Sequence, residues 1–124
     1  MKAEELSVLL IEDDDIEMGI GVKSLGWVGI RRVDAATTEF EAIRYVKNKK
    51  YDLIVSDTMD KNNYPFGPDI VRQAKRLGQT AIVVGMSNYR GNDKLWQGLA
   101  DYFFDKMIVY REGLQQVLKE KFGN

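Results

Sequence analysis

Short apolar runs alternate with longer segments of helical spacing along the whole chain, and this alternation limits the possible folds more than any other feature. Five runs have the length of strands: SVLLI (7–11), GIRRV (29–33), DLIVS (52–56), AIVVGM (81–86) and YFFD (102–105). Strand followed by helix, repeated five times, makes the strands parallel and places helices on both faces of the sheet. The sequence therefore predicts an α/β doubly wound sheet, with residues 1–124 forming one domain.

The segments between the runs carry signals for helix ends. Thr38 and Glu41 have the spacing of a capping box before the second helix, and Pro68 suits the first position of the third. The fourth expected helix, DKLWQGLA (93–100), is short and is interrupted by a glycine, whereas the fifth, REGLQQVLKEKF (111–122), runs almost to the end. Trp96, within the fourth segment, suits either an exposed docking face or simple packing.

Two residue types are absent, and their absence excludes whole classes of chemistry. Without cysteine there are no disulfides, thiolate metal sites or thiol nucleophiles, and without histidine there are no imidazole metal sites or internal phosphohistidine. The 18 basic and 19 acidic side chains nearly cancel, so no overall field favours DNA or a membrane surface. No signal peptide opens the chain and no apolar run approaches ~20 residues, which predicts a cytoplasmic protein.

Polar residues follow four of the five expected strands. Glu12 and Asp13 come after the first, Asp57 after the third, Ser87 after the fourth and Lys106 after the fifth. Only the second strand, as placed at 29–33, lacks an obvious polar terminus. Because ligands bind beyond the carboxyl ends of strands in an open parallel sheet, we expect these side chains to meet at one edge.

The expected cluster suits phosphoryl transfer. Three neighbouring carboxylates repel one another without a cation, and their oxygen atoms suit a hard ion such as Mg²⁺. An ionised Asp57 beside such an ion can attack phosphorus, as aspartyl nucleophiles do. Lys106 and the Ser87 hydroxyl are then expected to contact the transferred phosphoryl group.

Over essentially its whole length, the chain resembles the response-regulator receiver domains of two-component signalling, the CheY-like superfamily. The matching residues are the Glu12-Asp13 pair after VLLI, Asp57 in YDLIVSD, Ser87 in IVVGMS and Lys106 in ADYFFDK. The resemblance implies a (βα)5 flavodoxin-like three-layer sandwich with parallel strand order 2-1-3-4-5.

The resemblance also implies how the site works. Mg²⁺, for which Mn²⁺ substitutes, would be held by Glu12, Asp13, Asp57 and the backbone carbonyl of Met59. Asp57 would accept a phosphoryl group from a histidine kinase or a histidine phosphotransfer protein. The chain would then be a phosphoacceptor and not an enzyme, with at most slow self-dephosphorylation.

Further residues take expected roles from the same resemblance. Lys106 and Ser87 would engage the phosphoryl group, and Phe103 falls at the switch aromatic, although a core aromatic explains it equally well. Met59 and Tyr89 lie where the family tunes water access, and neither has a carboxylate or amide to orient water. The fourth helix, fifth strand and fifth helix would form the face that changes on phosphorylation and controls a downstream protein.

No DNA-binding or catalytic module follows KEKFGN at the end of the sequence. We therefore expect a stand-alone switch, without direct DNA binding or membrane association, that is a monomer or a weak phosphorylation-dependent dimer.

Four positions depart from the family pattern. Lys61 replaces a usual proline, Asn88 replaces a small residue, and Met107 replaces the proline that commonly follows the lysine. The loop before Gly67 is about two residues longer than usual. These departures affect loop geometry and the choice of partner more than the reacting groups.

Other interpretations remain open. Asp14 and Asp15 fit a helix N-terminus better than a metal site. A phosphate-independent receiver-like binding module would bind its partner equally well after Asp57→Ala. A haloacid-dehalogenase-type phosphatase would turn over a generic phosphatase substrate and would lose that activity after Asp13→Asn, although the chain has no room for a cap.

Overall fold

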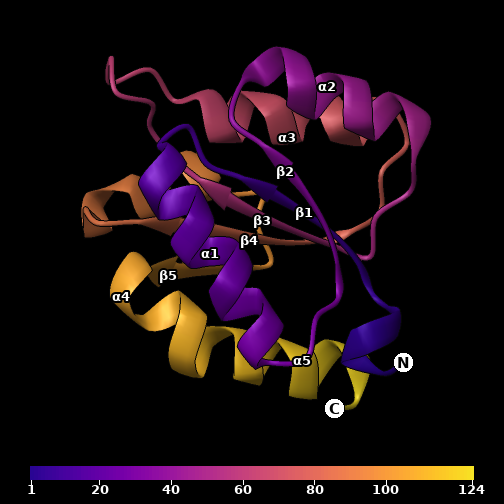
Figure 1. Cartoon of the computed structure of the whole chain (residues 1–124). Helices are drawn as coiled ribbons and strands as arrows, with labels where there is room; N and C mark the ends of the chain where they lie inside the picture. The colour runs from indigo at the N-terminus through magenta and orange to yellow at the C-terminus, as the bar shows by residue number, and fades with distance from the viewer.

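A computed structural model describes residues 1–124, and its centre is one parallel sheet (Figure 1). The strand order is β2-β1-β3-β4-β5, and every neighbouring pair is parallel. This topology confirms the predicted flavodoxin-like fold and its strand order. The strands are Ser7–Ile11 (β1), Arg32–Ala36 (β2), Leu53–Asp57 (β3), Ile82–Ser87 (β4) and Tyr102–Asp105 (β5).

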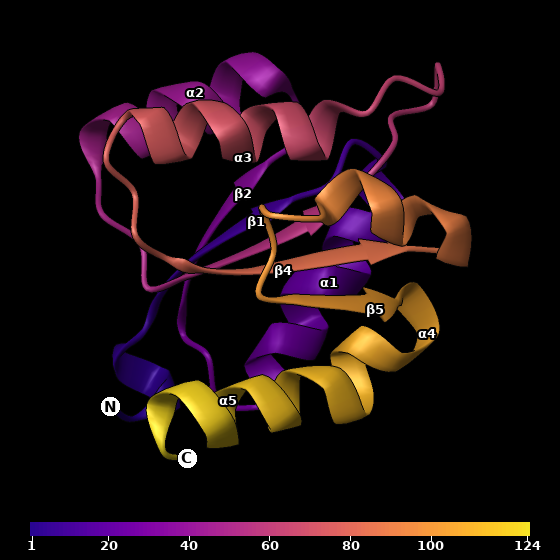
Figure 2. The same cartoon turned by 180° about the vertical axis from the view of Figure 1, so that it is seen from behind.

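Helices cover both faces of the sheet, as a doubly wound fold requires. Helices α2 and α3 lie together on one face, whereas α1 and α5 cover the other (Figures 1 and 2). The α-helices are Asp15–Trp27 (α1), Glu39–Asn48 (α2), Phe66–Arg76 (α3), Lys106–Ile108 (α4) and Leu114–Phe122 (α5). Two 3₁₀ helices, Ala3–Glu5 (η1) and Arg90–Trp96 (η2), and a π-helical turn, Val109–Gly113 (η3), complete the chain.

Four strands lie within one residue of the predicted bounds, but the prediction of 29–33 for the second was wrong. Gly29 has a φ of +95° and belongs to the turn after α1, so β2 begins only at Arg32. Ser7 pairs with Arg32 in β1–β2 register, and Ile11 pairs with Ala36. As β2 ends at Ala36, a polar residue does follow it. Thr37 donates from its backbone N and its hydroxyl to Glu41 Oε1.

The expected α-helix over 93–100 was also wrong. The chain forms the 3₁₀ helix η2 over Arg90–Trp96 instead, and Gly98 turns with a φ of +75°. Trp96 is 2% exposed and packs against Gly85 of β4, where an added Cβ would lie 2.6 Å from the indole ring. Because Trp96 points into the core, packing explains it and a docking role does not.

The expected fifth helix, 111–122, begins earlier than predicted. Helical backbone starts at Lys106 in α4, passes through the π turn η3 and continues as α5. The face predicted from the fourth helix, fifth strand and fifth helix has no long fourth helix, because the 3₁₀ helix η2 stands in its place. Its counterpart here consists of η2, β5 and the helical segment from Lys106 onward.

Side-chain caps explain where the helices begin. Asp14 Oδ1 accepts from the backbone N of Ile16 at 2.9 Å and of Glu17 at 3.0 Å, which confirms the helix-start interpretation of this part of the acidic run. Thr38 Oγ1 caps α2 through Glu41 N at 3.1 Å, as predicted. Helix α3 begins at Phe66, so Pro68 occupies its third position and not its first.

Two apolar clusters fill the space between the sheet and its helices. One packs against α1 and α5 and contains Leu10, Val55 and Leu114, whereas the other lies under α2 and α3 and contains Leu9, Ile54 and Ile70. Neighbouring residues of one strand thus serve opposite faces. This packing fixes the ends of β1 and β3. No helix has the length and apolar character needed to cross a membrane.

Candidate functional site

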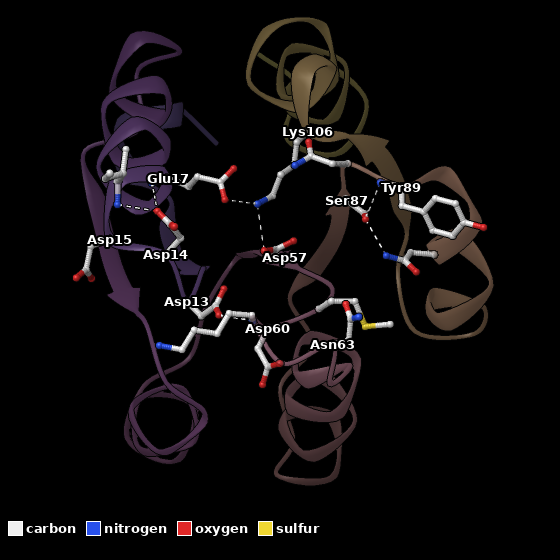
Figure 3. A pocket seen from close by; sticks show the side chains of 15 residues that line it. Asp13, Asp14, Asp15, Glu17, Asp57, Asp60, Asn63, Ser87, Tyr89 and Lys106 are labelled. Atoms are coloured by element: carbon white, nitrogen blue, oxygen red, sulfur yellow. Dashed lines mark hydrogen bonds and ion pairs between the residues drawn. The ribbon is translucent and has the colours of Figure 1, made fainter.

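The carboxyl ends of β1, β3, β4 and β5 border one cavity of about 720 Å³ (Figure 3). The parallel register sets this convergence, because Asp57 ends β3 opposite Met86 and Ser87 ends β4 opposite Asp105. The structure thus brings most of the predicted side chains together. The predicted residues that line the cavity are Asp13, Asp57, Met59, Ser87, Tyr89 and Lys106.

Lys106 is the positive centre of the site. Its Nζ lies 2.7 Å from Glu12 Oε1, 3.1 Å from Asp57 Oδ2 and 3.1 Å from Glu17 Oε2. Burial alone would lower the pKa of Lys106, but the Glu12 and Asp57 carboxylates raise it overall. The ammonium therefore stays protonated and joins three carboxylates, which come from the residue after β1, the first turn of α1 and the end of β3.

Glu12 lies beneath the cavity and is 1% exposed. Burial raises the pKa of Glu12 to about 7, even though the hydrogen bond from Lys106 opposes the shift. Burial likewise raises the pKa of Asp57, which is 7% exposed and whose Oδ1 accepts from Thr58 N at 2.8 Å. One lysine thus only partly offsets the desolvation of two buried carboxyls, and added positive charge would stabilise their ionised forms.

The raised pKa of Glu12 predicts how stability depends on pH in the absence of divalent cations. The folded-state pKa of about 7 exceeds the ordinary value of 4.5, so the folded protein binds more protons between these pH values. Stability from Glu12 is therefore full below pH 4.5 and is lost as pH rises through 7. We expect this residue to lower the free energy of unfolding by on the order of 1–3 kcal/mol across the interval.

Urea denaturation at pH 5 and pH 7.5 with a chelator present checks this dependence. Glu12→Gln is the control, because it removes the titrating group but keeps the shape. The quantity of interest is the wild-type change minus the Glu12→Gln change. A difference of zero, or a wild type that gains stability relative to the variant as pH rises, would contradict the prediction.

Three carboxylates form a candidate cation site. Oxygen atoms of Glu12, Asp13 and Asp57 all lie within 4.8 Å of one another. An all-oxygen donor set of this kind fits a hard divalent ion such as Mg²⁺. The raised pKa values of Glu12 and Asp57 agree with a cation at this position, because Lys106 alone does not offset the burial of the two carboxylates.

The loop after β3 is tied to this set through a backbone group. Lys61 N donates to Asp13 Oδ2 at 2.9 Å. A proline, which the receiver pattern usually has at this position, carries no N–H and could not make the contact. The departure at Lys61 therefore replaces a rigid residue with a hydrogen bond that positions Asp13.

Asp60 organises the same loop, although sequence reasoning missed it. Its Oδ1 accepts from Asn62 N at 2.8 Å and from Tyr64 N at 2.9 Å, and Asn63 turns with a positive φ of 59°. The signal was present in the sequence, because aspartate and asparagine, as in Asp60-Lys61-Asn62-Asn63, are typical of side-chain-stabilised turns.

Ser87 lies on the side of the cavity opposite Asp13 (Figure 3). Its Oγ accepts from Tyr89 N at 3.0 Å and from Asn92 Nδ2 at 2.8 Å. Tyr89 itself is 68% exposed on the rim. Asn92 is buried and was also missed, because the predicted helix over 93–100 begins one residue after it.

Two other residues complete the comparison with the predicted site. Glu17, three residues beyond the Asp14 cap, reaches Lys106 from the first turn of α1 and was not predicted to do so. Its place in the acidic run was the available signal. Phe103 does not line the cavity; it is half-buried and packs against the cluster under α2 and α3.

Comparisons with known proteins agree with the fold. A CheY-like response regulator receiver domain from Methylobacillus flagellatus superposes with a TM-score of 0.76 at 20% identity, covering 91% of this chain and 98% of the other. Response regulator TrrA from Thermotoga maritima, solved in complex with Mg²⁺-BeF, gives 0.77 at 18% identity over 92% and 97%. The receiver domain of histidine kinase PA1611 from Pseudomonas aeruginosa, solved with magnesium in its active-site cleft, gives 0.69 at 19% identity over 96% and 98%.

The chain therefore has the fold of CheY-like response-regulator receiver domains. Among curated proteins it is 29% identical to two-component system protein A of Emericella nidulans, over 94% of this chain. It spans only 17% of the length of that relative. No protein-family model matches the chain.

Proposed function

We propose that the chain is a phosphoacceptor switch of two-component signalling, with Asp57 as the residue that is phosphorylated. The observation that carries this proposal is the placement of Asp57. Its buried carboxylate ends β3 in direct contact with Lys106 and beside Glu12 and Asp13, and it faces an open cavity. A nucleophile, a cation site and a fixed ammonium are what transfer to an aspartate requires.

The transfer step uses Asp57 as the nucleophile. A carboxylate oxygen of Asp57 attacks the phosphorus of the donor, and a new phosphorus–oxygen bond forms. The bond from phosphorus to the leaving group breaks at the same time. The leaving group is acetate in acetyl phosphate or an imidazole nitrogen in a partner phosphohistidine, and it departs with the bonding electron pair.

Other side chains of the cavity stabilise the transferred group. Lys106 supplies a fixed positive charge within reach of Asp57, and the Ser87 hydroxyl donates to a phosphoryl oxygen. Glu12, Asp13, Asp57 and the Met59 carbonyl would hold Mg²⁺ or Mn²⁺. When bound, the ion would neutralise the carboxylates and the phosphoryl oxygens.

The intact mass of the protein after incubation with acetyl phosphate and Mg²⁺ tests the proposal. We expect the gain of one phosphoryl group, and we expect no gain in Asp57→Asn protein or without a divalent cation. Asp52→Asn is a matched control, since this aspartate directly precedes β3, at the end of the strand far from Asp57. It should leave the gain intact.

Failure of the gain in folded wild-type protein that binds Mg²⁺ would contradict the proposal. Such a result would favour a phosphate-independent binding module. Continuous release of phosphate from a generic phosphatase substrate, abolished by Asp13→Asn, would instead indicate a hydrolase.

The phosphorylated form should be long-lived. Met59 and Tyr89 both line the cavity, and neither has a carboxylate or an amide to orient a water molecule for attack on the phosphoaspartate. We expect loss of the phosphoryl group to take minutes to hours after the donor is removed. The decay of the phosphorylated mass measures this time. A lifetime of seconds would contradict the expectation.

The donor would be a histidine kinase or a histidine phosphotransfer protein, because the chain has no histidine of its own. We propose that phosphorylation changes the surface formed by η2, β5 and the helical segment from Lys106, and that this surface controls a downstream protein. Moving a population from 1:99 to 99:1 requires about 5.5 kcal/mol of differential stabilisation. A few charge-assisted contacts to the phosphoryl group can supply this energy.

A further inference from the structure

The Ser87 hydroxyl has both of its acceptor positions filled. A serine hydroxyl offers one hydrogen to donate and two lone pairs to accept. In this chain Asn92 Nδ2 donates to Ser87 Oγ at 2.8 Å, and Tyr89 N donates to the same atom at 3.0 Å. The hydrogen of the hydroxyl is therefore the only hydrogen-bonding capacity that Ser87 has left.

The hydrogen of the Ser87 hydroxyl is free to bind an acceptor inside the cavity. Ser87 and Asn92 line the same cavity as Asp57 and Lys106 (Figure 3). Ser87 is 5% exposed and Asn92 is 9% exposed, so bulk water has little access to the hydrogen bond between them. An incoming anionic oxygen in the cavity is an acceptor only, and it would meet a hydroxyl that is already restricted to donating.

We propose that Asn92 is a positioning residue that makes Ser87 an obligate hydrogen-bond donor toward the phosphoryl group on Asp57. This inference rests on the proposed function and adds to it a residue that contacts neither Asp57 nor Lys106. The 3₁₀ helix η2 carries Asn92, which returns to contact Ser87 at the end of β4.

The backbone around Asn92 holds it in place independently of Ser87. Asn92 N donates to Tyr89 O at 3.1 Å, and four residues later Trp96 Nε1 donates to Thr58 Oγ1 at 2.8 Å. Thr58 in turn donates from its hydroxyl to Met86 O at 2.8 Å. The segment that carries Asn92 is thus fixed at its Trp96 end to Thr58, the residue next to Asp57, and through Thr58 to Met86 of β4.

A double-mutant cycle tests the inference. The measurement is the initial rate of phosphoryl gain from acetyl phosphate with Mg²⁺, in wild type, Asn92→Asp, Ser87→Ala and the double variant. An aspartate can only accept, so the Ser87 hydrogen would turn toward it and away from the phosphoryl group. We expect Asn92→Asp to slow the gain about tenfold when Ser87 is present, and much less in the Ser87→Ala background.

The cycle separates positioning from simple charge repulsion or structural damage. A new negative charge in the cavity, or a local distortion, would slow both backgrounds by the same factor, and equal losses would overturn the inference. A rate of Asn92→Asp equal to wild type would also overturn it, since the amide oxygen and not the nitrogen would then face Ser87. Should Asn92→Asp not fold, Asn92→Leu replaces it in the cycle, with a smaller loss that must still depend on Ser87.

The wild-type sample distinguishes failure of the proposed phosphoacceptor function from failure of the proposed role of Asn92. If wild type gains no phosphoryl group, the proposed function fails and this inference fails with it. If wild type gains the group and the cycle shows no dependence between the two positions, only the role of Asn92 fails.

Discussion

Replacing Lys106 by methionine is expected to destabilise the metal-free protein in a strongly pH-dependent way. The change leaves Glu12 buried and without its 2.7 Å ion pair, and it also removes the contact with Asp57. Loss of one partner of a buried ion pair typically costs about 3–5 kcal/mol. Glu12 escapes part of this cost by binding a proton, because its pKa is already raised to about 7 and Lys106 is a group that lowers it.

Protonation of Glu12 determines how the stability penalty of Lys106→Met depends on pH. Without Lys106 the folded-state pKa of Glu12 rises further, so the folded variant keeps its proton to higher pH. The penalty relative to wild type is therefore small near pH 5 and grows as pH rises through 7. We expect a difference in the free energy of unfolding of about 1 kcal/mol or less at pH 5 and of several kcal/mol at pH 8.

Urea denaturation with a chelator at both pH values measures the difference. Lys23→Met is the matched control, because Lys23 is exposed on α1 and makes no ion pair. Its effect should stay within about 0.5 kcal/mol at either pH. Equal penalties for Lys106→Met at pH 5 and pH 8 would show that the ion pair with Glu12 does not control stability.

Replacing Gly67 by alanine is expected to disrupt the fold at Asp57. An added Cβ at Gly67 would lie 1.9 Å from the backbone oxygen of Asp57 and 2.8 Å from Ser56 Oγ. The obstacle is mainly main chain, which cannot rotate away like a flexible side chain. Overpacking of this kind costs about 1–3 kcal/mol and sometimes more, and here the start of α3 would have to separate from β3.

The same move would break a second contact, because Gly67 N donates to Thr58 O at 3.1 Å. We expect a loss of at least about 3 kcal/mol in thermal or urea denaturation, together with loss of phosphoryl gain in whatever fraction folds. Gly19→Ala is the control, since Gly19 is also within a helix but has no atom within 4 Å of the added Cβ. That change should stabilise the protein by about 0.5–1 kcal/mol. A Gly67→Ala protein as stable as wild type would contradict the close approach.

The sheet was predictable because its signal is local. Four of the runs that form β1, β3, β4 and β5 are short, apolar and bounded by polar residues, and the alternation with helices determines that they are parallel. The position of Glu12, Asp13, Asp57, Ser87 and Lys106 at one edge followed from the same pattern. The second strand was predicted three residues too early, because its exposed, basic start resembles the turn before it.

Parts of the site depend on contacts that spacing does not encode. Glu17 reaches Lys106 across 89 residues of sequence, and Trp96 is anchored by Thr58 across 38. The helix expected over 93–100 does not form because Trp96 packs into the core beside Gly85, a tertiary effect that overrides local preference. Asn92 lies in the 3₁₀ helix that forms in place of the expected α-helix, so the periodicity of the sequence could not have indicated its contact with Ser87.

The burial of Trp96 gives the chain a built-in optical probe of its own chemistry. The indole donates to Thr58, the residue directly after Asp57, whereas the second tryptophan, Trp27, is 84% exposed on α1. In a Trp27→Phe protein, all indole emission would originate from Trp96, which donates to Thr58, the residue directly after Asp57. The fluorescence of this single-tryptophan protein would then follow events at Asp57 in real time, without a label and without a partner protein.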